Sequence, residues 1–256
     1  MNTVLIFAIF AVTAAALVAA LVYYAAYGIR SQLFGQTVWR GRTDTNAVAL
    51  TFDDGPGKDT PALLDVLSKY NVKATFFLIG SRVELFPRIA QRIVAEGHEI
   101  GNHSFSHRIF LYCSRRRTEF EMNKAQEIIT STTKIAPRVA RPPCGVRNLA
   151  YFSATRKLRL KTVQWTTAGF DWKKCTADDI ARAVVGDATA GSIILLHDGD
   201  SEGKASRKAT VDSIPLILAA LREKNLEIVS LRKLLSPPES KEEQGELLHQ
   251  ISLGST

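Results

Sequence analysis

The sequence predicts an α/β domain with a largely parallel sheet, preceded by a membrane-spanning helix. From about residue 44 to 235, short apolar runs alternate with segments whose apolar residues recur every three to four positions, which is typical of strands alternating with helices. Ahead of them lies an uncharged apolar run over residues 4–28. The alternation leaves two architectures open, a barrel and an open sheet with helices outside.

The N-terminal run extends from Val4 to Gly28 without a charged residue. At a rise of about 1.5 Å per residue, a helix of this length exceeds the roughly 30 Å hydrocarbon thickness of a bilayer. Tyr23, Tyr24 and Tyr27 gather at its end, as aromatic residues do at membrane interfaces. A cleaved signal peptide has a shorter apolar core with basic residues before it. We therefore expect an uncleaved anchor, with a cleaved signal and a buried helix of a soluble domain as alternatives.

The remaining elements are predicted in chain order. Short apolar runs are predicted as strands, and amphipathic segments are predicted as helices. The expected strands are Ala47–Phe52, Lys73–Ile79, His98–Gly101, Thr162–Trp165, Ser192–Leu196 and Glu227–Val229. The expected helices are Thr60–Tyr70, Val83–Glu96, Thr118–Thr130, Ala177–Thr189 and Val211–Glu223. Residues 29–44 are expected to link the anchor to a domain over 45–235, and the polar, acidic residues 236–256 to form a loosely ordered tail.

Composition restricts the function. With 46% hydrophobic residues among 256, the chain can bury a sizeable core. A formal net charge of +8 fits an anionic membrane surface or envelope polymer, and no nucleic-acid motif accompanies it. The densest basic run, residues 115–117, is expected to be a solvated loop. Cys113, Cys144 and Cys175 lack metal-knuckle spacing, and their odd number leaves at least one unpaired in a monomer. Their roles stay open.

Two adjacent carboxylates, Asp53 and Asp54, stand where the first expected strand meets Gly55-Pro56. Successive strand side chains point to opposite faces, so a turn here lets the two aspartates do different work in one pocket. Like charges this close repel unless something neutralises one of them. A bound cation is the expected answer.

Two histidines, His103 and His107, follow the expected strand that ends at Gly101. Spaced four apart, they can face one point if the segment winds into a helical turn. Alone they could equally be surface or core histidines. Together with one aspartate they form a three-ligand set that leaves coordination positions open, as a catalytic metal requires.

Three further positions suit the chemistry of such a site. Arg141, just before Pro142-Pro143, can hold a buried carboxylate ionised and oriented through charge-assisted hydrogen bonds. His197 ends a buried strand at the edge where function gathers, which suits proton transfer. Asp171 precedes Trp172. Each also has a plain structural alternative, as a surface arginine, a packed histidine or a helix cap.

The ordered motifs TFDDGP, HSFSH, RPPCG, DW and LLH resemble those of the polysaccharide deacetylase family of carbohydrate esterases, which includes chitin, chitooligosaccharide and peptidoglycan deacetylases. The resemblance covers roughly residues 45–232. It implies a distorted, incomplete β/α barrel and a divalent ion, zinc or alternatively cobalt, manganese or nickel, that serves to remove N-acetyl or related acyl groups from sugars.

Carried over residue by residue, the resemblance implies a role for each position. Asp54, His103 and His107 would bind the metal, and Asp53 would be the general base for the water that the metal activates. Arg141 would orient Asp53. The general acid would be His197, and Asp171 would adjust the charge of its imidazole. The remaining positions lie around the substrate: the Cys144 amide for the oxyanion, and Trp172 and Leu195 for the acyl pocket.

The chain departs from the family pattern at two positions. Cys144 replaces the aromatic residue most common in the third motif, and Ala168 stands where many members carry an aspartate. Both departures affect substrate choice more than chemistry. The expected substrate is an N-acetylglucosamine glycan of the peptidoglycan or chitooligosaccharide kind. A lipid-linked amino sugar, a non-carbohydrate amide and a catalytically silent glycan-binding module are the alternatives.

Two arguments about membrane orientation conflict. Arg30, Arg40 and Arg42 follow the anchor, and the positive-inside rule would keep that side cytoplasmic. A glycan of the cell envelope instead requires an outward-facing domain. We expect a single-pass anchor with the catalytic domain on the extracytoplasmic side, and no nucleic-acid partner.

Overall fold

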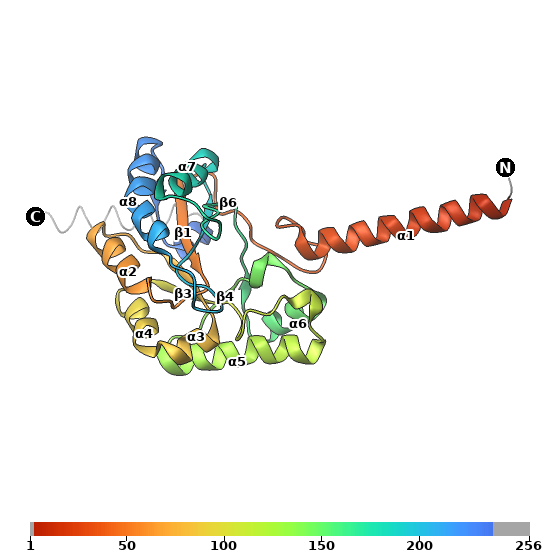
Figure 1. The fold of residues 1–256 in the computed structure, drawn as a ribbon, viewed down its shortest axis with the longest axis horizontal. Helices are drawn as coiled ribbons and strands as arrows, with labels where there is room; N and C mark the ends of the chain where they lie inside the picture. The colour runs from red at the N-terminus through yellow and green to blue at the C-terminus, as the bar shows by residue number, and fades with distance from the viewer. Residues whose placement is uncertain (1–2, 238–256) are drawn as a thin grey trace, which may run out of the picture.

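The computed structural model describes residues 3–237, in which helices surround a curled parallel sheet and α1 projects away from the domain (Figure 1). The strands are β1 (Ala47–Asp53), β2 (Thr75–Leu78), β3 (Glu99–Asn102), β4 (Val139–Ala140), β5 (Lys161–Thr162), β6 (Thr167–Ala168), β7 (Ile193–His197) and β8 (Glu227–Ile228). The α-helices are α1 (Thr3–Tyr27), α2 (Thr60–Lys69), α3 (Gly80–Leu85), α4 (Pro87–Ala95), α5 (Arg115–Thr133), α6 (Leu149–Lys157), α7 (Ala177–Asp187), α8 (Lys208–Glu223) and α9 (Leu231–Leu235). Two short 3-10 turns, η1 (Phe110–Tyr112) and η2 (Pro143–Gly145), lie in connections.

The sheet runs in the order β5-β4-β3-β2-β1-β7-β6, with β8 paired to the start of β1. Every strand pairing is parallel. Within residues 3–237 the end strands β5 and β6 do not pair with each other, so the barrel stays open. The expected distorted, incomplete β/α barrel is confirmed.

The centre of the sheet is β1, whose seven residues are all buried. A strand covered on both faces by helices can be apolar throughout, which is why this run shows no alternation. Its inner neighbours β2 and β7 are also buried over most of their length. Outside them α7 packs on α8, while α5 packs on α3, α4 and α6. The central strands are thus buried and paired side by side, which brings their carboxyl ends to one edge of the sheet.

One helix prediction was wrong. The expected helix Val83–Glu96 is two helices, α3 and α4, which meet at Phe86. Phe86 has φ −126° and ψ 56° because the ring of Pro87 disfavours a helical residue before it. Pro87 then begins α4, where its missing N–H costs nothing.

Other differences concern short or charged segments. The strand expected at Thr162–Trp165 is the two-residue β5, with Val163 in an isolated bridge to Val38. The strands β4 and β6 were not predicted, because two residues are too few to show a period. Residues 115–117 are exposed as expected, but they form the first turn of α5 rather than a loop.

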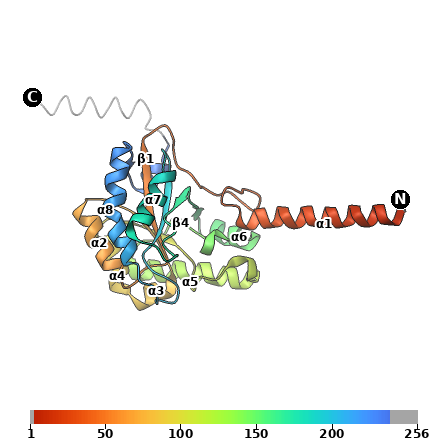
Figure 2. The ribbon, with the colours of Figure 1, turned by 45° about the horizontal axis from the view of Figure 1, so that its top comes forward.

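The apolar helix α1 is long and hydrophobic enough to span a membrane, a test that a signal sequence also passes. Only Ala25 and Ala26 of α1 are buried, which contradicts the alternative of a buried soluble helix. Figure 2 shows α1 leaving the domain on the side of α6. The segment expected as a linker, 29–44, lies against the domain, with Thr37 buried and Gly41 donating to Gly191. Of the expected tail, residues 238–256 lie outside the described residues.

Candidate active site

The site residues lie where strands end at one edge of the sheet. Asp53 closes β1, and its register partner on β7 is His197. On the other side of β1, His103 follows β3 and Arg141 follows β4. Because the strands are parallel neighbours, their carboxyl ends meet, and residues far apart in the sequence converge at one point.

A left-handed residue turns the chain after β1. Asp54 has φ 71°, so its side chain does not continue the strand alternation and faces the same pocket as Asp53. Gly55 follows, and a Cβ there would lie 2.0 Å from Oδ2 of Asp198. Glycine suits this point of the motif, because a side chain would displace the buried carboxyl group of Asp198.

Asp54, His103 and His107 form a group whose potential ligand atoms all lie within 4.8 Å of one another. Oδ1 of Asp54 lies 3.3 Å from Nε2 of His103 and 3.0 Å from Nε2 of His107. Burial would raise the pKa of the Asp54 carboxyl, but the two histidines bring it well below its usual range. The pocket thus stabilises an anionic carboxylate beside positive charge.

These three side chains fit a divalent ion. Nδ1 of His103 lies 2.7 Å from the Arg141 carbonyl oxygen, which can only accept a hydrogen bond, so Nδ1 carries the proton. In the neutral ring, Nε2 then presents a lone pair to Asp54 Oδ1, a buried atom that has no hydrogen-bond partner in the described chain. Two facing acceptors repel each other unless a metal ion or a proton lies between them. Burial opposes protonation of His103, but Asp53 and Asp54 raise its pKa, so the site favours positive charge either way.

The loop carrying the two histidines is not the helical turn that the spacing suggested. Residues 103–107 are irregular, and Ser104 and His107 adopt left-handed φ values of 65° and 57°. Glu121 of α5 holds this loop, because its buried carboxylate accepts hydrogen bonds from both the amide and the hydroxyl of Ser106 at 2.7 Å. The histidines therefore converge through a strained loop anchored on a helix.

Asp53 is held by a buried arginine. The Arg141 guanidinium donates to Oδ1 of Asp53 at 2.8 Å and to the hydroxyl of Thr51 at 2.8 Å. It also donates to the carbonyls of residues 163 and 164, and it lies 4.2 Å over the ring of Phe77. Arg141 is fully buried and Asp53 is 3% exposed. The carboxylate is fixed in one orientation, with its second oxygen 3.8 Å from His103 Nε2.

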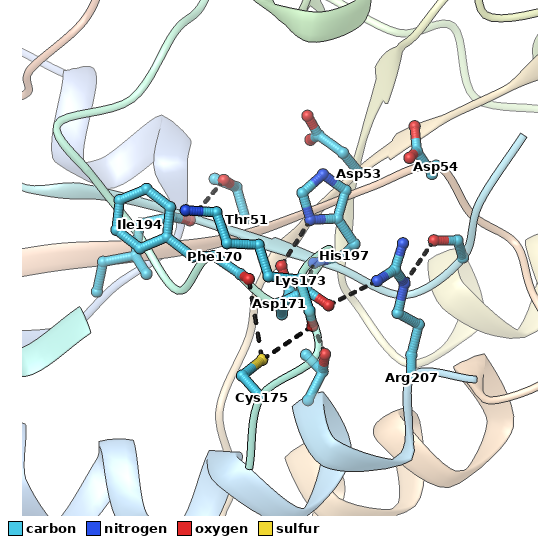
Figure 3. A network of polar contacts seen from close by, with 12 residues as sticks. Thr51, Asp53, Asp54, Phe170, Asp171, Lys173, Cys175, Ile194, His197 and Arg207 are labelled. Carbon is cyan, nitrogen blue, oxygen red and sulfur yellow. Dashed lines mark hydrogen bonds and ion pairs between the residues drawn. The ribbon is translucent and has the colours of Figure 1, made fainter. Parts of the chain in front are cut away.

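Across the pocket, His197 and Asp171 form a second pair (Figure 3). Asp171 accepts from the His197 backbone amide at 2.8 Å and from the Thr210 hydroxyl at 2.8 Å, while its Oδ1 lies 2.8 Å from His197 Nδ1. Burial opposes the charged forms, but this contact lowers the pKa of Asp171 and raises that of His197. With Nδ1 engaged, Nε2 is the imidazole nitrogen left for a substrate.

The residues expected around the substrate lie at different depths. The exposed Trp172 packs edge-on against His197, with ring centroids 5.4 Å apart. Leu195 is 3% exposed within β7, next to the buried Ala168 of β6. Cys144 is exposed in the turn η2 with a left-handed φ of 54°, and desolvation together with Asp54 and Asp53 raises the pKa of its thiol. All three cysteines are free thiols.

Several residues that support the site were not predicted. Of these residues, Glu121 could most easily have been predicted from the sequence, because it is an acidic residue on the buried face of α5 between Thr118 and Met122. Thr51 and Thr210 gave no signal, since isolated threonines are common. The buried Arg207 holds the Asp171 segment by donating to the Asp171 carbonyl at 2.7 Å (Figure 3).

Comparison with known proteins finds a matching family and several relatives. The polysaccharide deacetylase family profile matches residues 40–163. A peptidoglycan-N-acetylglucosamine deacetylase of Bacillus cereus is 38% identical over 187 residues, which cover 72% of this chain and 66%, just under two thirds, of that relative. A chitooligosaccharide deacetylase of Bradyrhizobium sp. is 36% identical over 199 residues, covering 74% of this chain and 91% of the relative.

Solved structures show the same fold. A peptidoglycan N-acetylglucosamine deacetylase in complex with 4-naphthalen-1-yl-N-oxidanyl-benzamide has a TM-score of 0.72 and 36% identity, covering 78% of this chain and 92% of that one. A CE4 family pseudoenzyme from Bacillus anthracis also has a TM-score of 0.72, at 27% identity over 78% of this chain and 69% of its own.

Fold and site together define an α/β domain with a half-open parallel barrel and a candidate metal site at the carboxyl ends of its strands. The chain belongs to the polysaccharide deacetylase family, as its five motifs predicted.

Proposed function

We propose that this protein is a metal-dependent hydrolase that removes N-acetyl groups from N-acetylglucosamine residues of a glycan at a membrane surface. The observation that carries the proposal is the facing arrangement of Asp53 with Arg141 and of His197 with Asp171 beside the ligand group of Asp54. The proposal thus assigns a base and an acid to either side of one cation site.

The reaction divides between these residues. A bound divalent ion supplies polarisation of the acyl carbonyl and a lowered water pKa. Asp53, held in place by Arg141, accepts a proton from the attacking water as the water oxygen bonds to the carbonyl carbon of the substrate. His197 donates the proton on Nε2 to the amine nitrogen as the carbon–nitrogen bond breaks, so acetate and a free amino sugar leave. Asp171 favours the protonated imidazole that this step needs.

The substrate's surroundings are part of the proposal. The Cys144 amide is assigned to the developing oxyanion, because it lies in the turn directly after Arg141. Trp172 and Leu195 are assigned to the acyl pocket, since Trp172 packs on the proposed acid and Leu195 lies two residues before it. Zinc is the favoured ion for two histidines and one carboxylate.

Acetate release tests the proposal. Full-length protein with zinc should release acetate from chitotetraose, and a chelator should abolish the release. Asp53→Asn should retain zinc but lose turnover, because only the base is removed. His103→Ala should lose zinc and turnover together. Normal turnover by Asp53→Asn would overturn the base assignment.

A catalytically silent glycan-binding module is the second candidate function, because one similar solved structure is a pseudoenzyme. Against it, every proposed acid, base and ligand position carries a suitable side chain. Glycan binding without acetate release from any N-acetylated sugar would favour the silent module. Release from simple aryl acetamides at equal efficiency would favour a general amidase.

For orientation, we propose that the catalytic domain faces the extracytoplasmic side, because related proteins are named for peptidoglycan. A fluorescent or enzymatic reporter fused after Thr256 tests this side directly. A signal from the cytoplasmic compartment would overturn the assignment.

A further inference from the structure

One buried arginine, which has no part in the mechanism above, attaches the end of the anchor helix to the domain. Arg147 lies between the turn η2 and the helix α6, and it is fully buried. Burial lowers the pKa of its guanidinium, and no aspartate or glutamate of the described chain acts against this. A buried charge without a counter-ion is costly, so the hydrogen bonds of Arg147 must compensate for it.

The guanidinium joins two segments that are far apart in the sequence. Its Nη1 donates to the carbonyl of Gly145 at 2.9 Å. Its Nη2 donates to the carbonyl of Gly28 and, at 3.1 Å, to the carbonyl of Ser31. The backbone amide of Arg147 also donates to the carbonyl of Ala26 at 3.2 Å. Four hydrogen bonds from one residue thus connect η2 to the end of α1.

The end of α1 explains why a positive charge is stable here. The last carbonyls of a helix lack partners within the helix and carry partial negative charge. The carbonyl of Ala26 is one of them, and the Gly28 amide closes the last turn by donating to Tyr24 at 2.8 Å. Arg147 therefore acts as a helix cap supplied from more than a hundred positions away. A cap alone, however, would not need the contact with Gly145.

That contact reaches the turn proposed to stabilise the oxyanion. Cys144 and Gly145 both adopt left-handed φ values, 54° and 70°. Two backbone hydrogen bonds close the turn, from Gly145 to Pro142 and from Val146 to Pro143. A residue other than glycine is strained in this conformation. The position of the Cys144 amide therefore depends on the groups that hold the turn from outside.

A buried glutamine links the same turn to the arginine that orients the proposed base. Nε2 of Gln164 donates to the Gly145 carbonyl at 2.8 Å, beside the hydrogen bond from Arg147. The backbone carbonyl of Gln164 accepts from Arg141 at 3.0 Å, and Arg141 in turn donates to Asp53. The end of α1 and the proposed base thus belong to one hydrogen-bond network, which passes through the η2 turn.

We propose that Arg147 is a positioning residue, which fixes the η2 turn and its Cys144 amide on the end of α1. Residues 26–31 are then part of the active site, and the anchor does more than attach the domain to a membrane. This proposal rests on the proposed deacetylation, in which the Cys144 amide stabilises the oxyanion.

Kinetics test the positioning role. Full-length protein with zinc, in detergent micelles, is assayed for acetate release from chitotetraose, and kcat is expressed per bound zinc. Arg147→Met keeps an unbranched side chain but removes every guanidinium donor. We expect kcat to fall at least about tenfold while KM changes less than about threefold, since an oxyanion contact is made only in the transition state. Unchanged kcat would overturn the positioning role.

The matched control for this variant is Arg82→Met. Arg82 is also a buried arginine, but it lies in α3 over the ring of Phe86 and away from η2. Its kcat should stay within about twofold of the unmodified protein. An equal fall of kcat in the two variants would overturn the proposal, because it would show that any buried arginine has this effect.

Hydrogen exchange tests the turn without metal and without turnover. With a chelator present, exchange of the Gly145 and Val146 amides is followed by mass spectrometry. Arg147→Met should speed this exchange at least about tenfold, because the turn has lost its outer support. The amides of β7, which pairs with β1 at the centre of the sheet, should change less than about twofold. Equally faster exchange in η2 and β7 would overturn the proposal, because the variant would then loosen the whole domain.

A second variant disturbs the other end of the attachment. A Cβ at Gly28 would lie 2.6 Å from the carbonyl oxygen of Tyr24, so Gly28→Val shifts the turn that presents the Gly28 carbonyl. We expect kcat to fall at least about fivefold with KM kept, since a small displacement of a catalytic group is enough for such a loss. Ala19→Val is the control, because Ala19 is exposed in the middle of α1.

The double variant Gly28→Val with Arg147→Met decides whether the two ends act together. Its kcat should stay within about twofold of that of Arg147→Met, because both changes break the same attachment. Losses that multiply would overturn the role of the anchor end. No acetate from chitotetraose with the unmodified protein would overturn the proposed function, whereas the exchange of the η2 amides would still test whether Arg147 holds the turn.

Discussion

The buried pair of Arg141 and Asp53 makes a quantitative prediction about stability. Arg141→Met keeps an unbranched side chain over Phe77 but removes the charge that faces Asp53. Asp53 is 3% exposed, so water cannot replace the lost partner. The variant thereby leaves a buried carboxylate without its cation.

The magnitude follows from the contacts that are lost. Removing one partner of a buried ion pair costs about 3–5 kcal/mol. The carbonyls of Val163 and Gln164 also lose a donor, a loss of about 1 kcal/mol or more that stays even if Asp53 is neutralised. We therefore expect Arg141→Met to lower the free energy of unfolding by about 3–5 kcal/mol. Adding Asp53→Asn should restore at least about 1.5 kcal/mol of this, as coupled contacts do.

Urea unfolding of the full chain in detergent micelles, followed by tryptophan fluorescence, measures both values. The ring of Trp165 lies 5.8 Å from the Arg141 guanidinium and reports on this region. A chelator is present throughout, because metal bound to the folded state would add its own stabilisation. Arg82→Met is the matched control, since Arg82 is a buried arginine over Phe86 without an ion pair in the described chain.

The control should lose less than about 1.5 kcal/mol, as a buried arginine without a charge partner leaves no uncompensated charge. A loss below about 1 kcal/mol in Arg141→Met would refute the reasoning. So would a double variant whose loss equals the sum of the two single losses, because the pair would then not be coupled.

Three further predictions concern the site. Because contact with Asp171 raises the pKa of His197, Asp171→Asn should lower that pKa and move the alkaline limb of the kcat–pH profile to lower pH; an unmoved limb contradicts it. Asp54→Asn should abolish zinc binding measured by metal analysis after dialysis while the circular dichroism spectrum is kept, and full retention of zinc would exclude Asp54 as a ligand. Glu121→Gln should weaken zinc affinity about tenfold by loosening the loop of His107, whereas unchanged affinity in a competition titration would show that the loop holds without it.

The sequence predicted the central elements well, because their signal is local. β1 and β7 are buried runs that hydrophobicity alone predicts as strands, and their observed ends differ from the predicted ones by at most one residue. The two-residue strands β4, β5 and β6 extend the curled sheet at its two ends, yet their formation depends on neighbouring strands rather than on their own residues. A local pattern could therefore predict strands and helices but not how far the barrel closes.

The same division holds in the site. The sequence by itself determined the candidate site residues, since carboxylates, histidines and an arginine at strand ends were identifiable from type and position. Only the tertiary structure decided how they meet: the left-handed turn at Asp54, the Glu121 contact that holds the histidine loop, and the contact between Arg141 and Asp53. These contacts join residues up to 88 positions apart, and their geometry depends on packing that no local pattern encodes.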